Sequence, residues 1–310
     1  MNRELVRSAA RTAALGGIVV LGLGTSAAAM AQPPVTVHVP CYAGALVSAI
    51  SGAVSGETIV LAGGCVYRLD EALPDVAVDL TIVGLDSELL RDYGAPNFAL
   101  LTLDGDVDLT VVNVDFRNGG GPDDDNGGAI QAPAGTELTV QGGIFTGNYS
   151  DGAGGAIQNK GILTVTGAYF IGNFAYSYGG AIYSQDDATV YGSTFQKNTT
   201  DGQLGGAIFN NGDMQVTGST FTGNSARNGG AVYNNVSLTM THDNLTGNTA
   251  DDDGGGIYNE YDLAVYGGVI DFNWAGDEGG GLYDTGCGSF TLTHSAIYGN
   301  VPDNIFDDDC

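Results

Sequence analysis

The heptapeptide YGGAIYS at residues 178–184 decides the fold, because nearly the same letters return along most of the chain. Close variants of its core are GGAIQ, GGAIF, GGAVY, GGGIY and GGGLY. The second glycine of each pair falls at Gly128, Gly155, Gly180, Gly206, Gly230, Gly255 and Gly280. Successive glycines are therefore 24 to 27 residues apart. A steady period of this size is typical of solenoid proteins, in which each repeat is one coil of the chain.

A second marker keeps the same phase as the glycine pair. It is a large apolar residue three positions before an asparagine. The seven examples are Phe145 with Asn148, Phe170 with Asn173, Phe195 with Asn198, Phe221 with Asn224, Leu245 with Asn248, Ile270 with Asn273, and Ile297 with Asn300. Two independent markers with one period argue against a chance repeat.

Between the two markers, short runs alternate apolar and polar residues, such as LTV at residues 138–140 and MQV at 214–216. A period of two indicates a β-strand, and the GGAI and F-x-x-N segments add two more strands to each repeat. The repeats lack a 3.6-residue period, which excludes helical solenoids. Because one repeat cannot bury its apolar side alone, we expect coils stacked about 4.8 Å apart with their strands in parallel sheets. The predicted fold class is all-β, a parallel β-helix.

The repeated glycines and asparagines have structural roles in such a coil. The glycine pair lies where the backbone enters a strand, and positive φ or an absent Cβ relieves crowding between coils there. The asparagine tolerates a left-handed bend, and its amide can bond the equivalent asparagine one coil away. Neither role requires catalysis.

The repeats resemble those of chlamydial polymorphic outer membrane proteins and of the wider right-handed parallel β-helix family in exported bacterial proteins. The resemblance covers roughly residues 126–300, and the segment CYAGALVSAISGAVSGETIVLAGGCVYRL at residues 41–69 is similar to the leader of many such proteins. It implies that a short helix over Ala43–Val54 closes one end of the core and that Thr58–Ala62 begins the first coil. The chlamydial proteins end in a membrane barrel, for which the residues up to Cys310 contain no counterpart. The resemblance therefore implies the fold and not that mode of surface display.

Three regions are expected along the chain. Residues 1–31 have a basic start, an apolar stretch and a small-residue cleavage pattern, which predict a secretory signal peptide, with a retained membrane anchor as the alternative. Residues 32–75 form the N-terminal cap and first strand, and residues 76–310 form the β-helix. We expect a secreted, extracellular protein that can be associated with the cell surface, without a transmembrane segment in its mature chain.

The charge balance excludes some classes of partner. Removing residues 1–31 leaves 6 Lys and Arg against 35 Asp and Glu, a formal net charge of −29. Such a surface repels phosphate backbones, so no nucleic acid is expected as a partner. Anionic polysaccharides are poor partners for the same reason, unless cations intervene.

The four cysteines predict disulfides near both ends of the mature chain. They are Cys41, Cys65, Cys287 and Cys310. An exported chain meets an oxidising environment, and pairing by proximity would close two short loops, although four cysteines allow three connectivities and free thiols remain an alternative. A zinc site is disfavoured because no C-x-x-C pair exists.

A search for catalytic residues favours a protein that is not an enzyme. Hydrolases of this fold use clustered Asp with His and Arg-x-Lys, and the lyases use Ca²⁺ held by Asp with an Arg or Lys base. Arg-x-Lys is absent, and the basic residues beyond the cap are isolated along the sequence. Among them are Arg117, Lys160, Lys197 and Arg227. His242 and His294 occupy a column that is glycine in most coils, which favours a structural role over a catalytic or metal-binding one.

Acidic loops before the glycine pairs should stack into one edge. Its candidate metal ligands are Asp251, Asp252, Asp253 and Asp277, joined by acids of the other loops, including Asp123, Asp124 and Asp125. A solvated edge is the simplest interpretation. Weak Ca²⁺ binding is an alternative because hard cations prefer oxygen ligands, and adaptation to high salt is another. No other cofactor is expected.

The residue after GGAI forms a further column, which alternation places on the outer face. Its members are Gln131, Gln158, Tyr183, Phe209, Tyr233, Tyr258 and Tyr283. The five aromatic residues are the candidate carbohydrate-binding residues, because stacked rings can hold sugars, although such rings can equally stabilise neighbouring coils.

Together these features predict a secreted, non-enzymatic, adhesin-like repeat protein that binds a glycan or another cell-surface partner. The alternatives are a polysaccharide lyase or glycoside hydrolase of the parallel β-helix type, and a structural or cation-binding envelope component. The identity of the partner and the oligomeric state are left open by the sequence.

Overall fold

The computed structural model describes residues 35–121 and 127–308. The predicted signal peptide, Asp123–Asp125 and Cys310 lie outside these residues. Contacts divide the chain into residues 1–33 and a unit of residues 34–310, and all described residues belong to the second unit.

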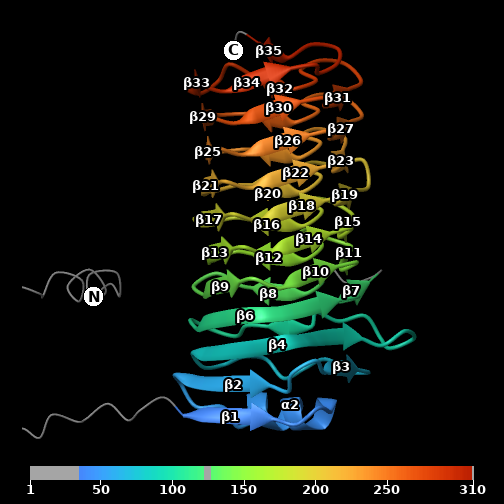
Figure 1. Ribbon diagram of the computed structural model, residues 1–310, viewed down its shortest axis with the longest axis vertical. Helices are drawn as coiled ribbons and strands as arrows, with labels where there is room; N and C mark the ends of the chain where they lie inside the picture. The colour runs from blue at the N-terminus through green and yellow to red at the C-terminus, as the bar shows by residue number, and fades with distance from the viewer. Residues whose placement is uncertain (1–34, 122–126, 309–310) are drawn as a thin grey trace, which may run out of the picture. The chain divides into compact units, whose positions relative to one another are not determined.

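The N-terminal part of this unit contains a helix, and no other is present in the described residues (Figure 1). The first elements are β1 (Thr36–Val39), α2 (Ala43–Ser51), β2 (Glu57–Leu61) and β3 (Val66–Leu69). The helix begins where expected and ends three residues early, because Gly52 follows it as the C-cap. Leu46 and Ile50 of α2 are buried in the hydrophobic core, as a helix that covers the end of the core requires.

Two long strands follow, β4 (Leu80–Arg91) and β6 (Asp108–Arg117), and from there the coils become regular (Figure 1). The first strand of each regular coil is β9 (Glu137–Gln141), β13 (Ile162–Thr166), β17 (Ala188–Tyr191), β21 (Asp213–Thr217), β25 (Ser237–Thr241), β29 (Asp262–Tyr266) or β33 (Phe290–Thr293). The second is β10 (Ile144–Thr146), β14 (Tyr169–Ile171), β18 (Thr194–Gln196), β22 (Thr220–Thr222), β26 (Asn244–Thr246), β30 (Val269–Asp271) or β34 (Ala296–Tyr298). These strands join β1–β4 and β6 in one 19-stranded sheet.

Two smaller sheets complete the coil. A seven-stranded sheet contains β7 (Gly120–Gly121), β11 (Tyr149–Ser150), β15 (Phe174–Ala175), β19 (Thr199–Thr200), β23 (Ser225–Ala226), β27 (Thr249–Ala250) and β31 (Trp274–Ala275). A nine-stranded sheet contains β5 (Leu101–Thr102), β8 (Ile130–Ala132), β12 (Ile157–Asn159), β16 (Ile182–Ser184), β20 (Ile208–Asn210), β24 (Val232–Asn234), β28 (Ile257–Asn259), β32 (Leu282–Asp284) and β35 (Ile305–Asp307). Most regular coils therefore have four strands where three were expected, because the two residues that directly follow the asparagine form an additional short strand.

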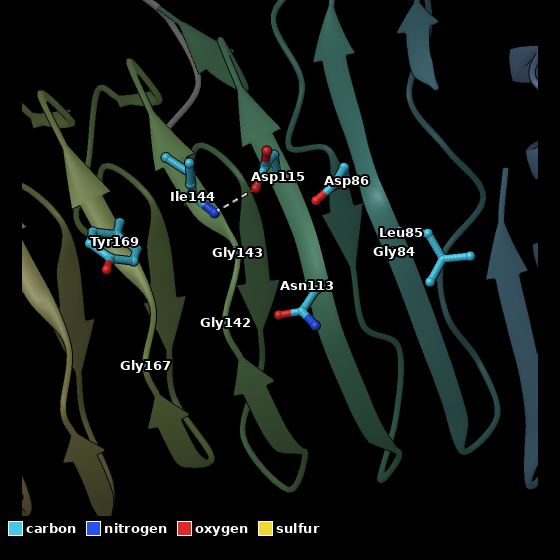
Figure 2. Close-up of a pocket in the computed structure, with 10 residues that line it drawn as sticks. All are labelled: Gly84, Leu85, Asp86, Asn113, Asp115, Gly142, Gly143, Ile144, Gly167 and Tyr169. Carbon is cyan, nitrogen blue, oxygen red and sulfur yellow. Dashed lines mark hydrogen bonds between the residues drawn. The ribbon is translucent and has the colours of Figure 1, made fainter. Parts of the chain in front are cut away.

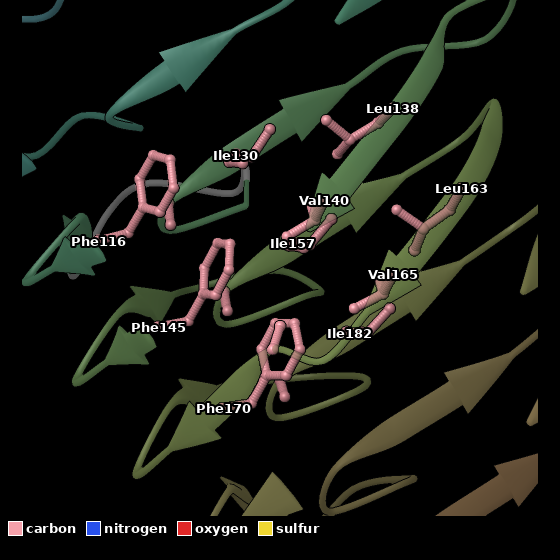
Figure 3. Close-up of a cluster of buried hydrophobic side chains, with 14 of the residues drawn as sticks. Phe116, Ile130, Leu138, Val140, Phe145, Ile157, Leu163, Val165, Phe170 and Ile182 are labelled. Carbon is pink, nitrogen blue, oxygen red and sulfur yellow. The ribbon is translucent and has the colours of Figure 1, made fainter. Parts of the chain in front are cut away.

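Neighbouring coils pair in parallel and in register, which confirms the predicted parallel β-helix. Ile157 lies between Ile130 and Ile182, and Phe170 between Phe145 and Phe195. The stacked phenylalanine rings of the core are 4.7–4.8 Å apart, and each is fully buried (Figure 3). Each such side chain contributes roughly 1.5–3 kcal/mol by leaving water.

The asparagine marker forms the expected amide ladder. Asn173 Nδ2 donates to Asn198 Oδ1 (2.9 Å) and to the Phe145 carbonyl of the preceding coil (3.0 Å). The same two bonds recur along the column of Asn148, Asn173, Asn198, Asn224, Asn248 and Asn273. These asparagines are at most 1% exposed, so the ladder satisfies polar groups that each turn would leave buried.

The two glycines of each pair have different roles. Gly179 has a φ of 61°, in the left-handed region. A Cβ on Gly180 would collide with the carbonyl of Gly206 and the backbone of Thr199. The first glycine therefore supplies the bend, and the second allows adjacent coils to approach.

The disulfide Cys41–Cys65 is present, with 5.6 Å between the Cα atoms. This confirms one of the two proximal pairings, whereas the partner expected for Cys287 lies outside the described residues. Within the described part of the chain, no helix has both the length and the apolar character needed to cross a membrane.

Candidate functional site

The predicted aromatic column exists as a stack of rings on the nine-stranded sheet, here called the aromatic ladder. It comprises Tyr183, Phe209, Tyr233, Tyr258, Tyr283 and, beyond the prediction, Phe306. Successive ring centroids are 4.8–5.6 Å apart, and the ring planes are nearly parallel. Each inner ring therefore has neighbours on both faces, and ligands of the inner rings would meet edges and hydroxyl groups.

Burial changes the hydroxyl groups of this ladder. Tyr233 is 5% exposed, and its hydroxyl donates to the Glu260 carboxylate. Burial first, and this hydrogen bond second, raise the pKa of Tyr233 far above its usual value. Burial likewise raises the pKa of Tyr258 to about 12. The ladder hydroxyls are protonated at physiological pH, as ordinary tyrosine hydroxyls are, and can donate hydrogen bonds.

The aromatic ladder ends in a step at Tyr183. The residue in register with Tyr183 in the preceding coil is Gln158, and the residue in register with Tyr178 is Ala153. Both are smaller than their neighbours in the next coil, and a pocket of about 310 Å³ opens over them. The ladder-end pocket is lined by Gly152, Ala153, Gln158, Lys160, Ser177, Tyr178, Tyr183 and Gln185.

A larger hollow, the bend groove, lies on the 19-stranded sheet where the chain turns between its two strand segments (Figure 2). It has a volume of about 580 Å³ and crosses β4, β6 and the two following coils. It is lined by Gly84, Leu85, Asp86, Asn113, Asp115, Gly142, Gly143, Ile144, Gly167 and Tyr169. The polar side chains come from the irregular coils, and the aromatic one from a regular coil.

Backbone conformation creates the floor of the bend groove. Gly142 and Gly167 have φ values of 69° and 64°, and Asn113 occupies the equivalent left-handed position one coil earlier at 49°. Asp86 is also left-handed, at 57°. Non-glycine residues in this region carry a conformational cost, and they cluster at functional sites. The sequence analysis missed both residues, because they lie in the irregular coils before the repeat begins.

Asp115 is the partly buried carboxylate of the bend groove. It accepts a hydrogen bond from the Ile144 backbone N–H at 2.8 Å (Figure 2). Burial raises the pKa of Asp115, and the negative charge of Asp86 raises it further, whereas the Ile144 hydrogen bond and Arg117 oppose the shift. Asp86 and Asp115 are thus two electrostatically coupled carboxyl groups facing one groove.

Two basic residues that are isolated along the sequence form ion pairs with carboxylates of neighbouring coils. Arg117 forms an ion pair with Glu88 at 2.8 Å, and Arg227 pairs with Asp252 at 2.6 Å. The Glu88–Arg117 pair borders a smaller hollow that shares Asp115 and Ile144 with the bend groove. The stacking of coils brings these charges together, and the sequence analysis did not pair them.

A family model for the right handed beta helix region matches residues 99–270, more than half of the chain. The chain belongs to the right-handed β-helix family. No curated protein and no solved structure matched it in the two other comparisons. The ladder-end pocket of this β-helix lies within the matched region, whereas the bend groove begins before it.

Two loops of the predicted acidic edge, those of Asp251–Asp253 and of Asp277, lie on neighbouring coils. The Asp252 N–H donates to the Arg227 carbonyl, and the Asp277 N–H donates to the Asp252 carbonyl, both across coils. Asp253 accepts from the Glu278 backbone N–H at 3.1 Å, and burial first, then Asp277 and Asp252, raise the pKa of Asp253. Among the described residues, no group of three or more His, Cys, Asp and Glu is arranged to hold a metal ion, so the Ca²⁺ site stays a prediction.

The two repeat-column histidines sit where glycine is the rule. His242 and His294 have φ values of 58° and 54°, like the glycines that align with them. Their conformation agrees with the structural role, since this column requires a left-handed backbone. The next residue after His242, Asp243, is 3% exposed, and its burial raises its pKa to about 7.

A second polar column was missed by the sequence analysis. It lies two residues after the buried Ile, Val or Leu of each glycine pair and contains Asn159, Ser184, Asn210, Asn234, Asn259 and Asp284. Asn234 Nδ2 donates to Asn259 Oδ1, and Asn259 Nδ2 donates to Asp284 Oδ1, both at 2.6 Å. The recurring letters IYN, IFN and VYN are the signal that could have shown it.

Proposed function

We propose that this β-helix protein is exported, associates with a surface and binds a neutral glycan chain in the bend groove without transforming it. The observation that carries the proposal is the combination of an open groove, an exposed aromatic ring and polar side chains at one place. The Tyr169 ring is 50% exposed and borders the groove (Figure 2).

Each element of the groove matches a part of a sugar. The C–H face of a sugar ring packs on an aromatic face, as Tyr169 offers. Sugar hydroxyls donate to the carboxylates of Asp86 and Asp115 and exchange hydrogen bonds with the Asn113 amide. The two carboxylates and the net charge of the protein disfavour an anionic chain at this groove. The glycines of the floor allow a ligand to approach the backbone closely.

The test is a glycan array of neutral oligosaccharides, followed by calorimetry on the best ligand. Asn113→Gly removes the amide and introduces a residue that also tolerates the left-handed backbone. Tyr169→Ala removes the ring. Each should weaken binding by about tenfold, which corresponds to about 1.4 kcal/mol. Tyr266→Ala is the control, because Tyr266 is exposed on the same sheet outside the groove. Absence of any glycan ligand, or unchanged affinity in both groove variants, would refute the proposal.

A carbohydrate-active enzyme is the second candidate, favoured by the coupling of Asp86 and Asp115 in one groove. A carboxyl group with a raised pKa, as Asp115 has, can act as a general acid beside a second carboxyl group. Assays for new reducing ends and for unsaturated products on neutral and acidic polysaccharides separate the two functions. An enzyme would lose turnover in Asp115→Asn, whereas a binding protein yields no product in any variant.

A further inference from the structure

The ladder-end pocket differs from the acidic surface that surrounds it. None of its eight lining residues is acidic, and Lys160 is one of only two lysines in the chain. The segment beside it, FAYSY at residues 174–178, carries no acid, whereas the corresponding segments of the two adjacent coils contain Asp151 and Asp201. The acidic edge is therefore interrupted where the pocket opens.

Lys160 carries a positive charge that no carboxylate of the described residues neutralises. Arg68, Arg117 and Arg227 each pair with a carboxylate, and Arg91 donates to backbone carbonyls. Lys160 is exposed and forms no ion pair with any residue of 35–121 or 127–308. Two acids directly adjoin lining residues along the chain, Asp151 and Asp186. Asp151 accepts a hydrogen bond from the Tyr149 hydroxyl at 3.1 Å, and Asp186 accepts one from the Asp187 backbone N–H at 2.9 Å. The ammonium group is available to a ligand.

The remaining lining residues suit a sugar ring. Tyr183 is covered by Phe209 on one side, and on the other side the column continues with the amide of Gln158 instead of a ring. Tyr178 packs against Phe209 with 4.8 Å between ring centroids and forms a second aromatic wall. Gln158 and Gln185 carry amides that can donate to and accept from sugar hydroxyls. About 310 Å³ is at the lower end of small-molecule pockets, which suits one sugar residue rather than a chain.

We propose that the ladder-end pocket binds a terminal sugar that carries a carboxylate, with the carboxylate on Lys160 Nζ and the ring against Tyr178 and Tyr183. The surrounding charge does not forbid this ligand, because acids farther from its one carboxylate than a Debye length, about 8 Å at physiological ionic strength, are largely screened from it. A polyanion would meet the whole acidic surface. This site is separate from the bend groove, which takes a neutral chain.

The experiment compares the methyl glycosides of glucuronate and glucose, and of galacturonate and galactose, by calorimetry or ligand-observed NMR on the purified protein. Sodium acetate tests whether the carboxylate alone is sufficient. We expect at least one acidic glycoside to bind about tenfold more tightly than its neutral counterpart, as one charge-assisted hydrogen bond provides, and acetate not to bind measurably. Equal affinity within both pairs, no binding of any glycoside, or binding of acetate as tight as that of the acidic sugar would overturn the proposal.

Two variants locate the site, and one serves as a control. Lys160→Gln should abolish the preference for the acidic sugar, whereas Lys197→Gln, which removes the same charge outside the pocket, should keep it. Gln158→Tyr should extend the aromatic ladder by one ring and fill the pocket, so it should abolish binding without lowering the melting temperature. A preference that survives Lys160→Gln, or binding that survives Gln158→Tyr, also contradicts the proposal. Binding of neutral oligosaccharides in the bend groove should not respond to these variants, so the two proposals fail separately.

Discussion

Asp243 illustrates how one substitution in a repeated column changes the physics of a coil. In neighbouring coils the side chains of Ser193 and Ser219 accept a backbone N–H from the preceding coil, and Asp243 accepts the Ser219 N–H at 2.6 Å in the same way. A serine hydroxyl does this without charge. A carboxylate at the same place is buried, so its ionised form is disfavoured.

We expect Asp243→Ser to stabilise the protein at pH 8 and to leave it nearly unchanged at pH 4. Burial raises the pKa of Asp243 to about 7 in the folded state, from about 4 in the unfolded chain. The folded state then binds the proton more tightly, so this carboxyl lowers the free energy of unfolding progressively as the pH rises from about 4 to 7. The gain should be on the order of a few kcal/mol above pH 7. Thermal unfolding across this range measures it, with Asp213→Ser, an exposed acid of the same sheet, as the control. A gain that does not depend on pH would contradict the expectation.

At the scale of the element, the ladders explain why such short strands are stable. A two- or three-residue strand has few hydrogen bonds of its own, but its side chain continues a column through neighbouring coils. The phenylalanine column supplies apolar burial, and the asparagine column satisfies the backbone at the turn. The F-x-x-N marker predicted both columns because the two residues recur in every regular coil. The aromatic ladder was predicted as a column of rings on the outer face. The structure shows in addition that the faces of its inner rings are covered by the neighbouring rings.

Asn198→Ala should lower the stability of the whole solenoid. The change leaves the Asn173 N–H and amide without their acceptor and the Phe170 carbonyl without its donor, all of them buried. At roughly 1–3 kcal/mol for each unsatisfied group, the total is several kcal/mol. Asn244→Ala, at an exposed strand position outside the ladder, should change stability by less than about 0.5 kcal/mol. Urea or thermal unfolding of the two variants compares them, and equal effects would show that the ladder is not the cause.

At the scale of the molecule, charge is the dominant feature after the fold itself. The mature chain is expected to carry 35 acids against 6 Lys and Arg, and stacking brings several of the acids, among them Asp252 and Asp277, to one edge. Parallel stacking places equivalent positions of neighbouring coils about 4.8 Å apart. Like charges at equivalent positions therefore repel unless ions screen them. The Arg227–Asp252 pair relieves this repulsion at one point of the edge.

The predicted Ca²⁺ binding at Asp251, Asp252, Asp253 and Asp277 is tested by melting curves at millimolar CaCl₂ and at matched ionic strength in NaCl. Binding should raise the melting temperature more in CaCl₂, since a ligand that prefers the folded state stabilises it by mass action. Asp253→Asn with Asp277→Asn should remove the difference. Equal shifts in the two salts would leave screening as the only effect, and an unchanged midpoint in CaCl₂ would discard the cation prediction.

The sequence by itself determined the coil, its core columns and the asparagine ladder, because these repeat with one period and depend on residues that are close in the chain. Tertiary structure alone decided where the hollows lie. The bend groove needs the left-handed Asp86 and Asn113 of two irregular coils beside Tyr169 of a regular one, and the ladder-end pocket needs Tyr178 and Tyr183 above Ala153 and Gln158. Both sites arise where one coil differs from the next. The physical reason is that a hollow depends on which side chains of different columns and coils meet, whereas the repeat fixes the register only within a column of regular coils.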